Sequence, residues 1–470
     1  MNAVKKKKDF TQGPLFLPML TFVLPIMLTG ILQVIYNMAD NIVVGQFSGD
    51  PDALAAVGST SSLTNLVVNS MMGFAAGSGI VLSHAFGAKN HALVSKIVHT
   101  AMTLSVFAGV IFGLVGFFIS YPVLDLMGTK PELLDKATLY MQIICAGIPG
   151  LAVYNFGATI LRSIGDSKTP LYILSLSGLL NVVLNLVFVI AFHMSIAGVA
   201  LATIISQYLS AVAVVIVLNK RRSESYALDF KRLGIDRQIL LRIVRFGLPA
   251  AIQSSVFSLS NIVITSAINT FDTPIISAKT IAGNIEGLLY TALNAYMHAS
   301  LTFVGQNYGA KEGGRMKKSI LYAVGQVLVI GTLIGQIMLI FGEPLSLMYI
   351  DPADPNKALV LEKTLELLNL MLTSYVLCGV MESLAGSLRG LGFSITPMLV
   401  NLIGTCGTRV LWVTVFFPMP ALNNIVGLFL VYPVSWILTI LAHTTVLVLA
   451  RKKFKAVSYS EAAKEVAAVE

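Results

Sequence analysis

Long apolar segments recur along this chain, and each is long enough to cross a lipid bilayer. A transmembrane helix needs roughly 20 mostly apolar residues. Charged residues make up only 12% of the 470-residue sequence, too few to cover a soluble protein of this length. Twelve segments qualify: 15–44, 57–85, 98–120, 137–161, 170–192, 196–219, 245–270, 276–305, 319–341, 364–388, 397–417 and 422–450. The sequence therefore predicts an all-α integral membrane protein of twelve transmembrane helices.

The basic side chains predict how these helices are oriented. The net charge is +9, from 32 Lys and Arg against 23 Asp and Glu. If the amino terminus is cytoplasmic and the loops alternate, 26 of the 32 basic residues lie on the cytoplasmic side. The positive-inside rule then predicts a multi-pass protein of the plasma (inner) membrane with both termini in the cytoplasm. Because topology explains the basic excess, we expect the lipid bilayer as a partner and no nucleic acid.

The two halves of the chain resemble each other. Residues 161–170 match residues 388–397 at six of ten positions, with an offset of 227. Residues 86–89 match residues 308–311 with an offset of 222. Such similar offsets indicate a duplicated six-helix unit. Because six is an even number of spans, both copies enter the membrane from the same side and run in the same direction. We therefore expect two six-helix bundles related by a pseudo-two-fold axis along the membrane normal.

This repeat predicts four regions along the chain. They are an amino-terminal lobe over 1–219, a basic cytoplasmic connector over 220–244, a carboxy-terminal lobe over 245–455 and a cytoplasmic tail over 456–470. Two facing bundles can rock about a cleft and open it to alternate sides of the membrane. The sequence has no Walker A motif, no catalytic constellation and no metal-ligand spacing among its six His. We expect a monomeric transporter driven by an ion gradient, with no cofactor and no enzymatic activity.

Asp40 is the first candidate for the coupling group. An ionisable side chain inside a span is costly and marks a functional site. Gln33, Tyr36, Asn37 and Asn41 lie three or four residues from Asp40 or from one another, so they share roughly one helix face. A carboxyl among amides could carry a proton or form part of a sodium site. The alternative is a carboxylate near the outer mouth, open to water.

Polar residues also mark other spans. Asn181 and Asn185 share a face of the fifth span and Thr203 follows on the sixth, where interhelical hydrogen bonds would explain them as well. Glu286, Tyr290, Asn294 and His298 recur every four residues and so form a polar stripe along one helix. Such a stripe lines either a cavity or a packed interface, and we favour a cavity. Arg409 and Glu286 lie at comparable depths, so they could form a pair. The candidate substrate-cavity residues are Gln33, Tyr36, Asn37, Asn65, Asn69, Ser254, Ser258, Asn261, Glu286, Tyr290, Asn294, His298, Glu382 and Arg409.

Several of these segments together resemble the multidrug and toxic compound extrusion (MATE) family of secondary transporters, in its prokaryotic DinF-like branch. The resemblance rests on Pro25 and on residues 38–45, 53–58, 161–166, 181–185, 197–203, 304–310 and 388–390, which span nearly the whole chain in order. It implies an antiporter that exports hydrophobic or cationic small molecules, such as drugs and toxic metabolites, in exchange for H⁺ or Na⁺ by alternating access.

The resemblance also implies a cation-coupling site. Asp40, Asn181, Asn185 and Thr203 match its positions, and Pro25 matches the family's bending proline. With Na⁺ as the coupling ion, Asp40 and Asn185 would be metal ligands. Asn185 stands where many prokaryotic members carry Asp, so the identity of the ion stays open. A carboxy-terminal cation site of the NorM-like kind is not supported, because its acidic positions fall near Ser254 and at Cys378.

A lipid-linked oligosaccharide flippase of the same superfamily is the alternative function. Such a flippase would need several Arg in its cavity to hold a pyrophosphate group. Arg409 alone lies within a predicted span, which argues against that alternative.

Overall fold

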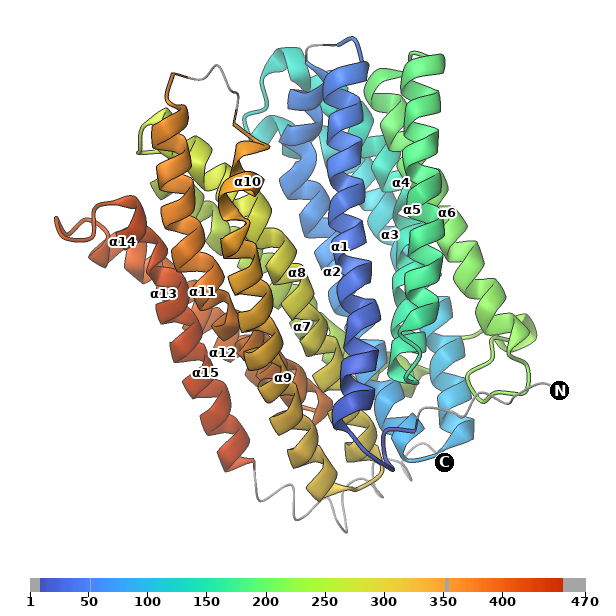
Figure 1. Ribbon diagram of the computed structural model, residues 1–470. Coiled ribbons are helices and arrows are strands. Elements are labelled where there is room, and N and C mark those ends of the chain that lie inside the picture. Colours follow the sequence, from blue (N-terminus) through green and yellow to red (C-terminus); the bar gives the residue numbers. More distant parts are fainter. Residues whose placement is uncertain (1–8, 51, 351–354, 451–470) are drawn as a thin grey trace. The chain divides into compact units, whose positions relative to one another are not determined.

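A computed structural model of the chain describes residues 9–50, 52–350 and 355–450 (Figure 1). The expected tail over 456–470 lies outside these residues. Within them every regular element is a helix, which confirms the predicted all-α class. Eleven helical segments in this part of the chain are long and apolar enough to cross a membrane.

The expected span over 276–305 is also helical, although its composition is less apolar than that of the other eleven. It forms helix α8, Thr273–Gly309, which is 37 residues long. Glu286, Asn294 and His298 lie inside it, and such side chains lower the apolarity of the whole segment. The polar residues that mark α8 as a candidate site therefore also make it the least typical membrane helix.

The described helices pack as two compact units, and two long helices contribute to both. Among the described residues, unit 1 comprises 28–254 with Asp9, and unit 2 comprises 10–27 and 255–450. Helix α1, Phe16–Phe47, passes from unit 2 to unit 1 after Met27, two residues beyond Pro25. Helix α7, Arg237–Ile268, passes from unit 1 to unit 2 after Ser254. The expected lobe boundaries at 219 and 245 stay a prediction.

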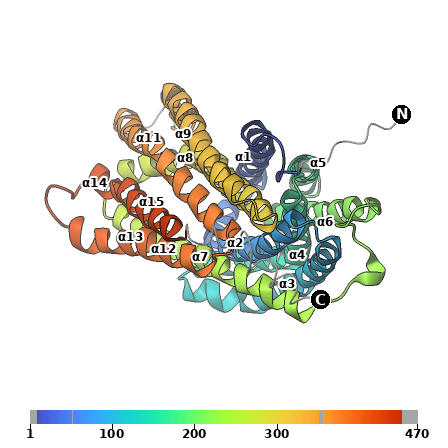
Figure 2. The same ribbon diagram turned by 90° about the horizontal axis from the view of Figure 1, so that it is seen from below.

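Unit 1 is centred on helix α4, which contacts α2, α3 and α6 (Figure 2). Pro131 begins α4, a position where its fixed φ and missing N–H carry no penalty. Besides the second part of α1 and the first part of α7, its helices are α2 (Ala53–Gly87), α3 (His91–Leu126), α4 (Pro131–Ser163), α5 (Lys168–Leu186), the π-helix η1 (Val187–Ala191), α6 (Ser195–Lys220) and the 3₁₀ turn η2 (Phe230–Arg232).

Unit 2 is built around α8 and α11, which contact each other and α9. Its apolar core includes the segment before and within the start of α1, where the Phe10 ring stacks on Phe303 with centroids 3.8 Å apart. Its further elements are α9 (Gly313–Ile340), α10 (Gly342–Leu347), α11 (Lys357–Gly390), α12 (Ile395–Asn401), the π-helix η3 (Leu402–Gly407), α13 (Thr408–Leu411), the π-helix η4 (Trp412–Phe416), α14 (Ile425–Phe429) and α15 (Val431–Leu449).

The sequence repeat extends to backbone conformation. Lys89 after α2 and Lys311 after α8 both have positive φ, at 57° and 62°. L side chains rarely adopt this left-handed region. Gly165 after α4 and Gly392 after α11 also share it, with φ of 91° and 84°. Matching helix ends in both units therefore follow the same local geometry, as a duplicated unit requires.

Small residues allow helices to pack closely within each unit. A Cβ atom at Gly73 of α2 would lie 2.5 Å from the backbone nitrogen of Ala251 in α7. A Cβ atom at Gly390 of α11 would lie 2.9 Å from the carbonyl oxygen of Leu301 in α8. Only residues without a Cβ permit these backbone approaches, and such contacts are typical of helices that pack in membranes.

Candidate functional site

The four residues expected to form the cation-coupling site lie together in unit 1. The Asn185 amide nitrogen Nδ2 donates a hydrogen bond to Oδ1 of Asp40 and another, of 3.5 Å, to Oδ1 of Asn181. The Asn181 Nδ2 donates to Oγ1 of Thr203 at 3.4 Å, and the Thr203 hydroxyl donates to the Val199 carbonyl at 3.0 Å. Helices α1, α5 and α6 thus bring these side chains into one hydrogen-bonded cluster.

The cluster contains an acceptor that no protein donor satisfies. Asn185 is 0% exposed and Asn181 is 6% exposed, whereas Asp40 and Thr203 are half-buried. Within the described residues, Oδ1 of Asn185 has no hydrogen-bond partner. A buried polar atom left unpaired costs about 1–3 kcal/mol. Carboxylate, amide and hydroxyl oxygens are the ligands that hard cations prefer, so the side-chain oxygens of this cluster fit a small cation.

Two features around Asp40 were not expected from the sequence. Tyr140 of α4 lies near Asp40 and packs against an apolar cluster that includes Val44 and Val189. A single tyrosine within an apolar span carries no signal that would have identified it. In addition, α5 changes to the π-helix η1 directly after Leu186, one residue beyond Asn185. Short π-helical turns often occur at functional sites.

The other unit 1 candidates have separate positions. Tyr36 donates a hydrogen bond from its hydroxyl to the Ser175 carbonyl at 3.2 Å, and its ring lies against Gly178 of α5. Ser254 is half-buried and donates to the Ala250 carbonyl at 3.1 Å. The remaining candidates are amides on α1 and α2: exposed Gln33, Asn37 and Asn65, and half-buried Asn69.

Arg409 forms the centre of a second polar cluster, in unit 2. It is 1% exposed, and its Nη1 donates to Oδ1 of Asn261 at 2.7 Å and to Ser260 at 3.4 Å. Its guanidinium carbon lies 4.7 Å from the Phe257 ring centre and 4.6 Å from that of Tyr432. The two rings supply cation–π stabilisation, which strengthens when the cation is desolvated. Arg409 belongs to α13, a single turn between the π-helices η3 and η4.

The pair that the sequence suggested between Arg409 and Glu286 is not an ion pair. The described part of the chain contains no contact within 4.0 Å between their charged atoms, and Oε2 of Glu286 has no hydrogen-bond partner there. Their charges nevertheless interact over a longer distance. The contacts of Arg409 with Asn261 and the two aromatic rings hold its guanidinium away from Glu286.

The remaining candidates of unit 2 lie on the helices around this cluster. Tyr290 of α8 hydrogen-bonds to the side chain of Asn294. Glu382 of α11 is 8% exposed and interacts electrostatically with Arg389. Two further candidates, Ser258 on α7 and His298 on α8, are half-buried.

The sequence did not identify the aromatic residues of unit 2 that lie beside these candidates. Phe257 and Tyr432 contact Arg409, and the Tyr375 ring centre lies 6.5 Å from that of Tyr290. In a membrane helix, an aromatic side chain packed on lipid and one packed on a cation follow the same apolar pattern. Only the fold distinguishes them.

One protein family matches parts of both halves of the chain. The MatE family model matches residues 25–187 and 249–414. The probable multidrug resistance protein YoeA of Bacillus subtilis is 27% identical over 429 residues, covering 89% of this chain and 90% of that protein. The FAD transporter of Shewanella oneidensis is 24% identical over 443 residues, covering 92% of this chain and 94% of that protein.

Solved structures share the fold. One is described as an outward-facing conformation of a multidrug resistance MATE family transporter of the MOP superfamily. It superposes with a TM-score of 0.85 at 20% sequence identity, covering 97% of this chain and 99% of that chain. These matches lend no support to the flippase alternative.

Proposed function

The chain belongs to the MatE family, and on this premise we propose that it is a secondary antiporter that exports small molecules in exchange for a cation. The expected substrates are hydrophobic or cationic compounds. The names of relatives support export, since they include a multidrug resistance protein and the multidrug export protein MepA of Staphylococcus aureus, 24% identical over 332 residues. The observation that carries the proposal is the hydrogen bond from Asn185 to Asp40 within a cluster of oxygen ligands.

We propose that H⁺ or Na⁺ binds at Asp40 and thereby changes how α1 contacts α5. An ionised Asp40 accepts the hydrogen bond from Asn185. A proton on the carboxylate, or a sodium ion shared with the free Oδ1 of Asn185, weakens that charge-assisted bond. Helix α1 can then move at Pro25, because proline lacks the N–H that would stiffen the helix there. Cation binding and release would in this way drive alternating access.

We also infer the setting in which this happens. The protein is a monomer in the plasma (inner) membrane. The distribution of basic residues predicts that both termini lie in the cytoplasm. The polar residues around Arg409, Glu286 and Glu382 belong to the substrate cavity in the carboxy-terminal lobe over 245–455. Flexible aromatic and polar side chains of this kind suit substrates of varied shape.

Efflux from proteoliposomes tests the proposal. The purified protein is reconstituted, a cationic dye is loaded, and a proton gradient or a sodium gradient is imposed separately. We expect one gradient to drive dye export, and Asp40→Asn to abolish that export without changing the thermal unfolding temperature. Asp125→Asn, which neutralises an exposed carboxylate of α3, is the matched control and should transport normally.

Ion-driven export that survives in Asp40→Asn would contradict the role of Asp40. Export that responds to neither gradient, in a folded wild-type protein, would contradict antiport itself.

A further inference from the structure

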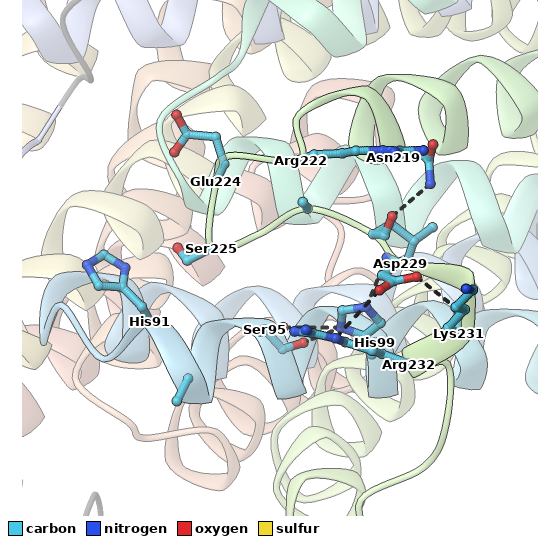
Figure 3. Close-up of a pocket in the computed structure, with 13 residues that line it drawn as sticks. His91, Ser95, His99, Asn219, Arg222, Glu224, Ser225, Asp229, Lys231 and Arg232 are labelled. Atoms are coloured by element: carbon cyan, nitrogen blue, oxygen red, sulfur yellow. Dashed lines mark hydrogen bonds and ion pairs between the residues drawn. The ribbon is translucent and has the colours of Figure 1, made fainter.

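A cavity of about 690 Å³ lies between the start of α3 and the chain that follows α6, all within unit 1 (Figure 3). Helix α3 forms one wall with His91, Ser95 and His99. The other wall is formed by Asn219 at the end of α6 and by Arg222, Glu224, Ser225, Ala227, Leu228, Asp229, Lys231 and Arg232. Sites for small molecules typically enclose roughly 300–1,000 Å³, so this cavity is large enough for a ligand.

Specific hydrogen bonds hold the cavity in shape. His99 is 4% exposed, and its Nδ1 donates to the Ser95 carbonyl at 2.7 Å. Its Nε2 accepts the backbone N–H of Asp229 at 3.0 Å, which ties the connector to α3. Asn219 donates from Nδ2 to the Leu228 carbonyl at 2.9 Å. The cavity therefore has a built wall on the connector side.

Of the three Arg and Lys residues that line this cavity, Arg232 alone has an acidic partner among the described residues. Asp229 accepts the Lys231 backbone N–H at 3.0 Å, and its carboxylate lies 3.5 Å from Nε of Arg232. In Figure 3 the Glu224 carboxyl points away from α3. The side chains of Arg222 and Lys231 form no ion pair with any described residue. Two uncompensated cations thus line a cavity whose acidic residues are engaged or turned away.

We propose that this cavity binds a phosphate group, held by Arg222 and Lys231. Guanidinium and ammonium groups form charge-assisted hydrogen bonds with phosphate oxygens, and arginine matches them in a bidentate manner. The Ser225 hydroxyl lines the same cavity and supplies another donor. Because the cavity exceeds the size of a phosphate ion, the phosphate belongs to a larger molecule: either the headgroup of an anionic lipid or a free phosphorylated metabolite.

Both sources fit the side of the membrane on which the cavity is expected. The distribution of basic residues assigns the connector to the cytoplasm, where anionic headgroups and phosphorylated metabolites both occur. This inference is independent of transport, since it concerns neither Asp40 nor the unit 2 cluster.

Two binding experiments distinguish the sources. In the first, the full-length protein in phosphatidylcholine nanodiscs is titrated with ATP as the probe. In the second, nanodiscs that also contain phosphatidylglycerol are used, and native mass spectrometry counts the lipids that stay bound. The test variant is Arg222→Gln/Lys231→Gln. The matched control is Lys96→Gln/Arg237→Gln, which removes the same charge at exposed positions outside the cavity.

We expect the wild type and the control to bind in one of the two experiments, and the test variant to bind at least about tenfold more weakly. Binding of ATP identifies a free phosphate compound, and retention of phosphatidylglycerol identifies a headgroup. Absence of binding in both experiments would overturn the proposal. Equal weakening in both double variants would also overturn it, because diffuse surface charge would then explain the binding. Thermal unfolding of each variant confirms that it is folded.

Discussion

The side-chain amide of Asn185 on α5 donates a hydrogen bond to the carboxylate of Asp40 on α1, while the oxygen of the same amide is buried without a donor. Asn185 therefore donates to the carboxylate through its amide nitrogen and places an acceptor oxygen beside it, where a bound cation could contact both. An amide cannot release a proton at physiological pH, so Asn185 orients the site while Asp40 alone carries the charge.

Replacing Asn185 should separate these two contributions. Asn185→Leu removes the donor to Asp40, and we expect ion-driven export to fall by roughly tenfold or more. Asn185→Asp instead places a second carboxyl beside Asp40. Because two adjacent carboxylates repel, a cation bound between them is favoured, so we expect this variant to export half-maximally at a lower driving cation concentration or to couple a second cation. Efflux rates measured over a series of ion concentrations test both variants.

Asn284→Leu, at an exposed position of α8, is the control for the loss of an amide. Wild-type ion dependence in both Asn185 variants would contradict a role for this amide in coupling.

The sequence predicted the proximity of the amino-terminal candidates better than that of the carboxy-terminal ones. Asn181 and Asn185 are four residues apart, so one helix face presents both, and their meeting with Asp40 follows once the helices pack. The depths of Arg409 and Glu286 could be counted from the ends of their spans. The direction of each side chain around its helix could not, and Arg409 turns to Asn261 instead.

The sequence also did not predict which distant segments pack against each other. The apolar pattern located the first span within a few residues, since 15–44 was expected and Phe16–Phe47 is observed. A membrane helix is apolar on every side, so its pattern does not say which helices cover which part of it. The change of α1 from unit 2 to unit 1 after Met27 was therefore not predictable.

Enlarging Gly178 should disturb the position of Tyr36. A Cβ at Gly178 would occupy the space of the Tyr36 ring, so Gly178→Val must displace that ring and its hydrogen bond to Ser175. We expect a loss of about 1–3 kcal/mol in the free energy of unfolding, as for other overpacked sites. Gly287→Val is the control, because a Cβ there meets no atom within 4 Å. Equal stability of the two variants, measured by unfolding in detergent, would refute this packing.

Arg409 should matter more for export than for stability. Replacing a buried charge by an apolar side chain of similar size is often neutral, because the cost of desolvating the charge is removed. We therefore expect Arg409→Met to keep the free energy of unfolding within about 1 kcal/mol of wild type and to lose dye export. Arg409→Lys keeps the charge but lacks the planar group between Phe257 and Tyr432, so it should be less stable than Arg409→Met.

Thermal unfolding and efflux are measured on the same preparations, with Arg237→Met as the exposed control. Normal export by a folded Arg409→Met protein would show that Arg409 serves packing only.

The loop after α4 should make stability depend on pH. Burial acts to raise the pKa of Asp166, but hydrogen bonds from the Thr169 hydroxyl and backbone, and the nearby Arg221 guanidinium, outweigh burial and lower that pKa below its usual value. Asp166 Oδ2 lies 2.7 Å from Nη2 of Arg221. A lowered pKa in the folded state means that ionised Asp166 stabilises the protein above the unfolded-state pKa of about 3.9.

This contribution is lost as the pH falls through the folded-state pKa. We therefore expect wild type to exceed Asp166→Asn in thermal stability by a constant amount between about pH 5 and 8, and the difference to shrink below about pH 4. Unfolding temperatures across this pH range provide the measurement. A difference that stays constant down to pH 3, or that grows as the pH falls, would contradict the assigned sign.

The stacking of Phe10 on Phe303 also constrains the order in which this protein can be made. Residues 10–27 leave the ribosome before residues 255–450, yet they complete the apolar core of unit 2, whose other helices come from the second half of the chain. Contacts so distant in sequence form late, because the intervening chain must exist before the ends can meet. The apolar side chains of residues 10–27 therefore need lipid or a chaperone to cover them until synthesis has passed α8.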